Sequence, residues 1–324
     1  MLQTATNSDL FARGLAAYDN PMQQTIQKSL SFTGTGLHSG AEVTMTFHPA
    51  GVNAGICFVR SDVADRDNHV PALWDRVVDT RLCTVLGNEA GVTVGTVEHL
   101  MAALRGCGID NLVIALDGPE VPIMDGSAAP FIEKIDEAGL KKQTKPRRAI
   151  RILKDIVWEE DGKRAVFRPA DSFVFQGEIA FDHPEIGRQE RTVSLVNGAF
   201  REEIANARTF GFAHEVAALR QAGLALGGSL DNAIVLDETK VLNKGGLRHA
   251  DEFIRHKLLD AVGDIYLAGL PILGLYESAR PGHAVNNALL RQLFTQRDAW
   301  DVVTLPAEEN SAAPVFRETL RAAA

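Results

Sequence analysis

The chain is poor in cysteine, and its few cysteines do not form a recognisable framework. Its 324 residues contain three, Cys57, Cys83 and Cys107, which lie far apart and form no CxxC pair. A disulfide scaffold or a zinc site built from thiolates alone does not fit this pattern. A reducing cytoplasm fits it best.

Long apolar runs are also missing. The longest, IYLAGLPILGLY at 265–276, is too short to cross a bilayer and contains Pro271. The first twenty residues have no continuous apolar stretch followed by a cleavage site of small residues, so we expect no secretory signal. The sequence therefore predicts a cytoplasmic protein without a membrane span.

An excess of basic charge is absent as well. The chain has 33 Lys and Arg against 42 Asp and Glu, which gives a formal net charge of −9. Nucleic-acid binders usually present a basic surface, so this balance argues against a nucleic-acid partner. Hydrophobic residues make up 45% of the chain, so a sizeable core can be buried.

The chain divides into two halves, and in each half the strand patterns come before the helical patterns. GAEVTMTFHPA and AGICFVRSD have strand patterns, and helical spacing follows at 96–108 and 127–140. In the second half, strand patterns such as SFVFQGEIAFDHP precede helical patterns at 253–264 and from about residue 284. This order predicts an α+β fold, and the likeness of the halves indicates a duplicated unit.

The charged segment KKQTKPRRA at 141–149 reads as a solvated linker between the halves. We therefore predict a mobile extension, two α+β domains and a C-terminal tail, at residues 1–24, 25–145, 146–305 and 306–324.

The segment FIRHKLLDAVGD at 253–264 raises the first chemical question. His256, Asp260 and Asp264 recur at every fourth residue, so one helix face stacks an imidazole and two carboxylates at spacings of about 5–6 Å. Such a face is a wet surface, a satisfied polar core or a metal site. Apolar neighbours favour the last two, because a buried carboxylate needs a partner or a cation.

Three further residues carry acid–base or ligand chemistry. Glu98 and His99 are neighbours in TVEHLMAAL and point about 100° apart on a helix, so Glu98 can reach a water beside an ion that His99 binds. The order differs from HExxH, so this is not the zincin motif. His283, between a glycine and a helix start, suits a general acid better than a rigid ligand. For each of the three, a structural role is the alternative. His48, His69, His183, His214 and His249 read as surface or turn residues.

Combined, these residues predict a metal-dependent amide hydrolase. Two histidines and one aspartate leave a coordination position open on zinc, as catalysis requires. Glu98 can take a proton from water, and His283 can protonate a leaving amine while Asp264 orients it. Thr209 and Lys257 can add hydrogen-bond donors. Fe(II) stays open as the metal, since N and O ligands do not select zinc alone. A peptidase and a non-catalytic RNA- or nucleotide-binding module are the alternatives.

Seven segments, in order between about Gln27 and Thr304, resemble the UDP-3-O-acyl-N-acetylglucosamine deacetylase family, the zinc amidases of the committed step in lipid A synthesis. They are GTGLHSG, TVEHLMAALRGCGIDN, PIMDGSAAPF, ARTFGF, LGGSLDNAIVLD, DEFIRHKLLDAVGD and GHAVNN. The resemblance implies two similar domains packed as a sheet-helix-helix-sheet sandwich. It also implies release of acetate from the small-molecule substrate UDP-3-O-(3-hydroxyacyl)-N-acetylglucosamine, and we expect a monomer.

The resemblance also implies a role for each candidate residue. Glu98 is the general base, His283 the general acid or cationic oxyanion partner, and Asp264 orients His283. Thr209 donates a hydrogen bond to the oxyanion. Lys257 helps to position the polar end of the substrate, which the resemblance implies is a phosphate. The implied zinc ligands are His99, His256 and Asp260.

Substrate contacts follow from the resemblance too. An inserted β-α-β segment at about 207–236 implies a hydrophobic passage for the acyl chain, and 74–87 forms a second insert beside the site. The implied substrate contacts are Leu82, Cys83, Thr84, Phe210, Gly211 and Phe212. Other passage residues are Ala217, Leu219, Gly223, Leu224 and Ala225. For Ala217 and Leu219 a core position is the alternative. His214 and Glu215 stand where relatives carry Arg and Asp, which leaves the preferred chain length open.

Overall fold

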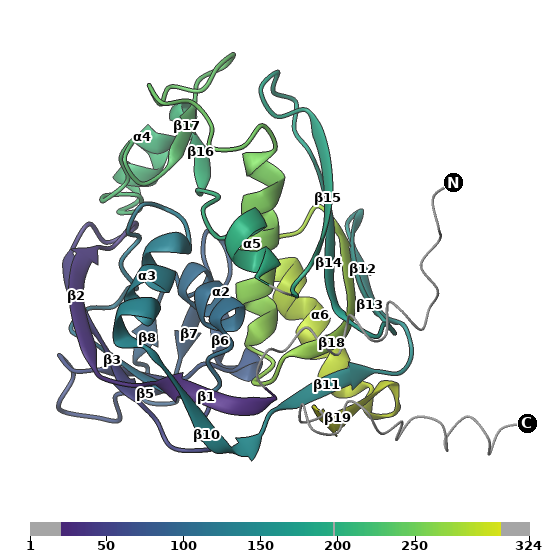
Figure 1. Cartoon of the computed structure of the whole chain (residues 1–324). Helices are drawn as coiled ribbons and strands as arrows, with labels where there is room; N and C mark the ends of the chain where they lie inside the picture. The colour runs from purple at the N-terminus through teal and green to yellow at the C-terminus, as the bar shows by residue number, and fades with distance from the viewer. Residues whose placement is uncertain (1–20, 197, 306–324) are drawn as a thin grey trace, which may run out of the picture.

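The structure, a computed structural model, describes residues 21–196 and 198–305. The fold is α+β, with two similar sheet-and-helix units packed so that the helices lie between the sheets (Figure 1). The predicted fold class is confirmed. The expected extension at 1–20 and the tail at 306–324 lie outside the described residues.

The first sheet has the order β2-β3-β9-β4-β5. Along β3, Val43, Met45 and Phe47 are fully buried and alternate with more exposed residues, as a sheet covered on one face requires. Helices α2 and α3 cover the inner face (Figure 1). The bounds are β2 (Leu30–Thr35), β3 (Glu42–Pro49), β4 (Ile56–Arg60), β5 (His69–Pro71), α2 (Glu98–Cys107), β9 (Leu112–Leu116) and α3 (Ala129–Ala138).

The second sheet contains β12-β13-β18-β11-β19, with β14 beside β18 and β15 beside β14. Helices α5 and α6 pack on its inner face. The bounds are β11 (Arg148–Ile152), β12 (Ile156–Glu160), β13 (Lys163–Arg168), β14 (Phe173–Ala180), β15 (Arg188–Ser194), α5 (Glu252–Tyr266), β18 (Ile272–Ala279), α6 (His283–Thr295), the 3₁₀ turn η3 (Arg297–Ala299) and β19 (Trp300–Thr304).

The two halves repeat one topology. In the first, β2, β3 and β9 are antiparallel neighbours, β9 is parallel to β4, and β4 is antiparallel to β5. In the second, β12, β13 and β18 are antiparallel neighbours, β18 is parallel to β14, and β14 is antiparallel to β15. In chain order α2 corresponds to α5, and α3 to α6. The predicted duplication is thus present in the fold.

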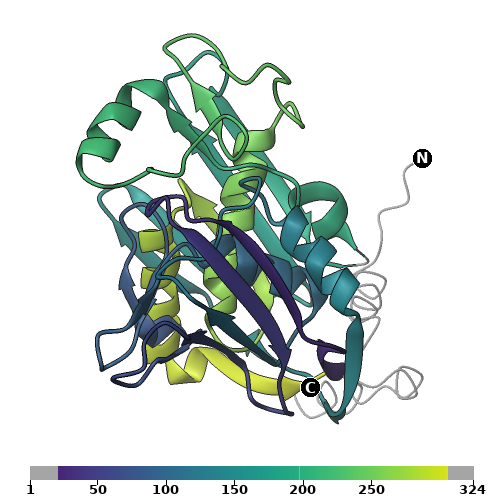
Figure 2. The same cartoon turned by 90° about the vertical axis from the view of Figure 1, so that its left-hand side faces the viewer.

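Each half carries an insertion between its fourth strand and its first long helix. The first contains the 3₁₀ turn η1 (Trp74–Arg76), β6 (Val77–Asp79), β7 (Val85–Gly87) and β8 (Thr93–Val94). The second contains the π-helical turn η2 (Phe200–Ile204), β16 (Phe210–Phe212), α4 (Ala213–Gln221) and β17 (Ile234–Leu236). Figure 2, which views the first sheet from outside, shows α4 standing beyond the sandwich at the top.

Two sequence expectations need correction where the halves join. The charged segment at 141–149 is not an irregular linker: it forms β10 (Leu140–Pro146) and the start of β11, because backbone pairing with β1 (Met22–Ile26) leaves its lysine side chains in solvent. Residues 22–24 therefore belong to a strand and not to a mobile extension. The Gln24 amide also donates to Asp110 Oδ2 at 2.7 Å. No helix among the described residues is long and apolar enough to cross a membrane.

Candidate active site

Helices α2 and α5 cross at the centre of the sandwich, and a glycine permits their close approach. A Cβ atom at Gly263 would overlap the Glu98 carbonyl oxygen and lie 3.0 Å from the Ala102 amide nitrogen. Gly263 stands between Asp260 and Asp264, so the polar face of α5 is pressed onto the first turn of α2. Side chains from both halves of the chain therefore meet there.

His99 from α2 meets His256 and Asp260 from α5 at this crossing. One ligand atom from each residue lies within 4.8 Å of the other two, and all three residues are buried. Asp260 Oδ1 is 3.5 Å from His99 Nε2 and 3.3 Å from His256 Nε2. The two imidazole rings stand edge to face, with centroids 4.9 Å apart.

The chemistry of this group fits a divalent cation. His256 Nδ1 is 3.0 Å from the Ala207 carbonyl oxygen, which can only accept, so this nitrogen carries the proton and Nε2 is left free to ligate. Burial lowers the pKa of His256 to about 4, against the raising effect of Asp260, so the imidazole is neutral. Asp260 Oδ1 is buried with no hydrogen-bond partner among the described residues. Two imidazoles and a carboxylate form a ligand set suited to zinc or Fe(II).

The charge state of Asp260 agrees with this fit. Burial alone raises the pKa of its carboxyl, but His256, Lys257 and His99 together hold that pKa well below its usual value. Lys257 Nζ lies 3.1 Å from Asp260 Oδ2. The carboxylate is therefore ionised and ready to bind a cation.

Glu98 and His283 face each other beside this cluster. Glu98 Oε1 lies 3.8 Å from His283 Nε2, and Glu98 Oε2 accepts from the Thr84 amide at 3.0 Å. Burial raises the pKa of Glu98, although His283 and His99 oppose this. Burial opposes the charge on His283, but Asp264 and Glu98 outweigh it and raise its pKa to about 9. A cationic imidazole thus stands opposite the carboxyl group of Glu98.

Asp264 is the centre of a buried hydrogen-bond network. Its Oδ2 lies 2.9 Å from His283 Nδ1 and accepts from Asn286 Nδ2 at 2.9 Å, while its Oδ1 accepts from Thr84 Oγ1 at 2.6 Å. Asn286 in turn accepts from the Tyr276 hydroxyl at 2.6 Å. The sequence reasoning missed Asn286 and Tyr276. Asn286 could have been found, because it lies three residues after His283 on the same helix face.

The predicted contacts in the first insert differ in exposure. Leu82 is 45% exposed, whereas Cys83 and Thr84 are buried. Burial raises the pKa of the Cys83 thiol to about 12, so it is protonated at neutral pH. The Thr84 side chain faces Asp264, so its hydroxyl belongs to the internal network.

The second insert places aromatic rings beside the cluster. β16 and β17 are parallel neighbours joined through α4, the β-α-β order implied by the resemblance. The Phe210 ring centroid lies 6.4 Å from that of His256, and Lys257 Nζ lies 5.5 Å from the Phe210 centroid. Thr209 is held through its backbone, by Gly126 and Ile234. Its hydroxyl makes no hydrogen bond to any other residue that the structure describes.

The remaining predicted passage residues are not in the core. Helix α4 buries none of its residues, so Ala217 is exposed and Leu219 is half-buried. Gly223 is exposed, and Gly211, Phe212, Leu224 and Ala225 are half-buried. None of these positions is sealed inside the core.

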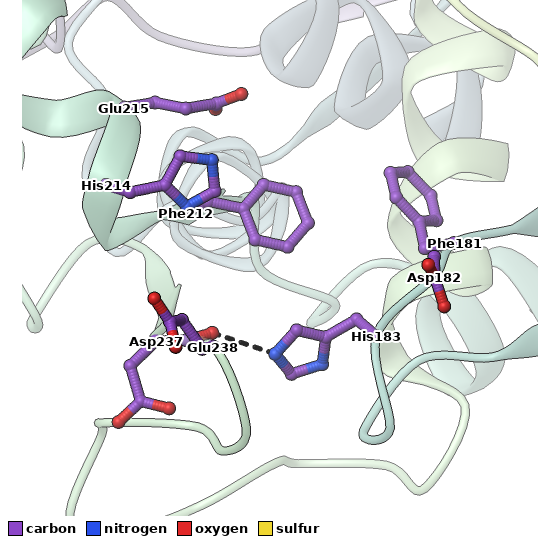
Figure 3. Close-up of a pocket in the computed structure, with 8 residues that line it drawn as sticks. All are labelled: Phe181, Asp182, His183, Phe212, His214, Glu215, Asp237 and Glu238. Carbon is purple, nitrogen blue, oxygen red and sulfur yellow. Dashed lines mark hydrogen bonds between the residues drawn. The ribbon is translucent and has the colours of Figure 1, made fainter.

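A surface pocket of about 420 Å³ opens next to β16 (Figure 3). The aromatic rings of this pocket are continuous with Phe210. The Phe181 ring centroid lies 5.8 Å from the ring centroid of Phe210 and 6.1 Å from that of Phe212. His183 and His214, which the sequence assigns to turns or surface, both line this pocket, and His183 Nε2 lies 2.9 Å from the Asp237 carbonyl oxygen. The lining residues are Phe181, Asp182, His183, Phe212, His214, Glu215, Asp237 and Glu238.

Comparison with known proteins gives a consistent result. The family model named LpxC, UDP-3-O-acyl N-acetylglycosamine deacetylase, matches residues 23–295. The chain is 49% identical over 282 residues to the UDP-3-O-acyl-N-acetylglucosamine deacetylase of Phenylobacterium zucineum, covering 87% of this chain and 96% of that protein. It is 47% identical over 295 residues to that of Shewanella oneidensis, with coverages of 90% and 95%. For Chromohalobacter salexigens the identity is 48% over 295 residues, with coverages of 90% and 96%. The chain therefore belongs to the UDP-3-O-acyl-N-acetylglucosamine deacetylase family.

Proposed function

We propose that this protein hydrolyses the N-acetyl amide of UDP-3-O-(3-hydroxyacyl)-N-acetylglucosamine, the committed step of lipid A synthesis, and that it uses zinc. The observation that carries the proposal is the meeting of Glu98 and His283 beside the buried His99, His256 and Asp260 group. Membership of the family and the names of the relatives supply the substrate.

His99, His256 and Asp260 would hold the ion. Zinc bound there supplies a Lewis acid and makes a water acidic near neutral pH. Ala207 orients His256 through its carbonyl oxygen, and Lys257 stands beside Asp260. Fe(II) would be held by the same donors.

Glu98 and His283 divide the proton transfers. Glu98 accepts a proton from the attacking water as a new C–O bond forms at the amide carbonyl. His283 Nε2, which faces Glu98, first stabilises the developing oxyanion by its charge. It then donates its proton to the amide nitrogen as the C–N bond breaks. Acetate leaves, and the sugar keeps a free amine.

In this proposal the substrate is bound by Thr209, by Lys257 and by the aromatic rings of Phe181, Phe210 and Phe212. The Thr209 hydroxyl donates to the oxyanion, and Lys257 pairs with a phosphate. The half-buried Phe210, Gly211 and Phe212 of β16 border the acyl passage. Leu82 is exposed in the first insert and can contact the same chain.

We also propose a cytoplasmic, monomeric enzyme. All three cysteines are free, which suits a reducing compartment. The substrate is a soluble acylated nucleotide sugar.

The first test pairs metal content with acetate release in wild type and His256→Ala. We expect about one zinc per wild-type chain, and loss of both metal and activity in the variant. Wild-type protein that holds metal but cleaves only peptides would favour a peptidase. Protein that holds no metal and releases no acetate would favour a binding module and overturn the proposal.

A further inference from the structure

A line of buried side chains runs from β18 through α6 to Asp264 on α5. Tyr276 donates from its hydroxyl to Asn286 Oδ1 at 2.6 Å, and Asn286 Nδ2 donates to Asp264 Oδ2 at 2.9 Å. The same carboxylate oxygen lies 2.9 Å from His283 Nδ1. Tyr276 is 1% exposed and Asn286 is fully buried, so both groups are shielded from bulk solvent.

Asp264 and Tyr276 together fix which way the Asn286 amide faces. Asp264 Oδ2 accepts from Asn286 Nδ2, so the amide presents its NH₂ group to that oxygen. Its carbonyl oxygen then points to Tyr276, which has a proton to donate. Without that donor, the buried oxygen of Asn286 would be left unsatisfied, and only the contact with Asp264 would hold the amide in this orientation.

We propose that Tyr276 and Asn286 are positioning residues that hold Asp264 in the orientation from which it aligns His283. This inference rests on the proposed role of His283 as general acid. Thr84 fixes the other oxygen of Asp264, so the carboxylate is held from both sides. Loss of the Asn286 donor leaves Thr84 alone to hold Asp264 against rotation, and the alignment of His283 becomes looser.

A purely structural role makes a different prediction, and the ring of Tyr276 allows the two to be separated. That ring packs against Phe175 and Phe167, with centroids 5.3 and 6.1 Å away. Tyr276→Phe keeps this packing and removes only the hydroxyl. Tyr266→Phe is the matched control, because Tyr266 also donates a buried hydroxyl, at 2.6 Å to the Ile109 carbonyl oxygen.

The experiment measures kcat and KM for acetate release, zinc content, and the NMR titration midpoint of the His283 imidazole. We expect Tyr276→Phe to lower kcat about threefold to tenfold with KM and zinc unchanged. We also expect it to lower the His283 midpoint. Tyr266→Phe should leave all four values unchanged. Asn286→Ala should cost at least as much as Tyr276→Phe, and adding Tyr276→Phe to it should cost nothing further.

The groups that influence His283 electrostatically are Asp264 and Asp260 on α5, Glu98 on α2, and His38 between β2 and β3. No variant in this experiment changes any of them. Equal losses of kcat in the two tyrosine variants, or additive losses in the double variant, would overturn the inference. If the wild type releases no acetate, the proposed function fails on its own. The His283 midpoint then still decides, because an unchanged value in Tyr276→Phe overturns the positioning role.

Discussion

Helices α2 and α5 hold equivalent places in the two halves, but their polar residues are distributed differently. In α2, Glu98 and His99 occupy the first turn, and the buried residues that follow, 100–104, are apolar. In α5, His256, Asp260 and Asp264 are spread over successive turns in the middle of a buried helix. The duplicated scaffold thus places two similar helices together, while the chemistry is divided unequally between them.

This division means that neither half contains a complete site. The first half has one proposed metal ligand, a histidine, and the proposed base, whereas the second has two proposed ligands and the proposed acid. Binding of a metal ion should therefore be coupled to the packing of α2 on α5. The following changes test that comparison, from the largest expected effect to the smallest.

Glu98→Gln tests whether α2 supplies a base as well as a ligand. We expect kcat to fall by about 10² to 10⁴, because no group is left to take the proton from water. Zinc content should match the wild type, unlike in His256→Ala. Elemental analysis and acetate release in the same samples decide this, and zinc loss in Glu98→Gln would make Glu98 a ligand.

Gly263→Ala tests the crossing itself. Alanine normally favours a helix interior over glycine, but here its Cβ overlaps the Glu98 carbonyl oxygen, so the helices must separate. We expect the free energy of unfolding to fall by about 1–3 kcal/mol, with weaker zinc binding. Denaturant unfolding and a zinc titration measure both. Gly245→Ala is the control, since nothing lies within 4 Å of a Cβ there.

Asp264→Asn tests the charge that α5 contributes to His283. With a pKa raised from 6.5 to about 9, His283 is protonated at neutral pH, so kcat/KM should decline as pH rises through about 9. The variant should show this decline at lower pH. The stabilisation linked to His283 is fully present below pH 6.5 and is lost as pH rises through about 9. The difference in unfolding free energy between wild type and variant should therefore shrink over that range. A decline at the same pH in both proteins would contradict the role of Asp264.

Thr84→Val tests the residue that contacts both Glu98 of α2 and Asp264 of α5. The Thr84 amide still donates to Glu98, but the hydroxyl bond to Asp264 is lost. We expect kcat to fall about threefold to tenfold, and Thr84→Ser to restore most of it. Steady-state kinetics at unchanged zinc content provide the measurement. A large rise in KM with kcat unchanged would instead favour the substrate contact implied by the resemblance.

Local sequence patterns predicted which residues share a face where the pattern was that of a helix. The four-residue spacing of His256, Asp260 and Asp264 puts them on one face wherever the helix lies, because helix geometry is local. The pairing of His99 with that face could not be predicted from spacing. It depends on the crossing of Glu98 and Gly263, which brings together His99 and His256, two residues 157 positions apart in the chain. Motif resemblance supplied that link instead.

Other features escaped prediction for the same reason. The segment at 141–149 looked like a linker because its side chains are charged, but its backbone pairs with β1, a strand more than a hundred residues earlier. Phe181 and His183 lie on the turn after β14, and only the packing of the second insert turns that segment into a pocket wall. Tyr276 reads as one apolar strand residue among others until its hydroxyl is found beside Asn286.

By itself, the sequence determined the α+β class and the duplicated order of elements. It also determined the spacing of His256, Asp260 and Asp264 on one face of α5, and the adjacent positions of Glu98 and His99. These depend on periodicity and on the chemistry of adjacent residues, which act over a few positions in the chain. Only the tertiary structure decided that Gly263 brings α2 onto α5, that Thr84 links Glu98 to Asp264, and that Asn286 and Tyr276 stand behind Asp264. Hydrogen bonds and steric contacts between distant segments have no local signature, because they exist only once the two sheets have packed around the helices.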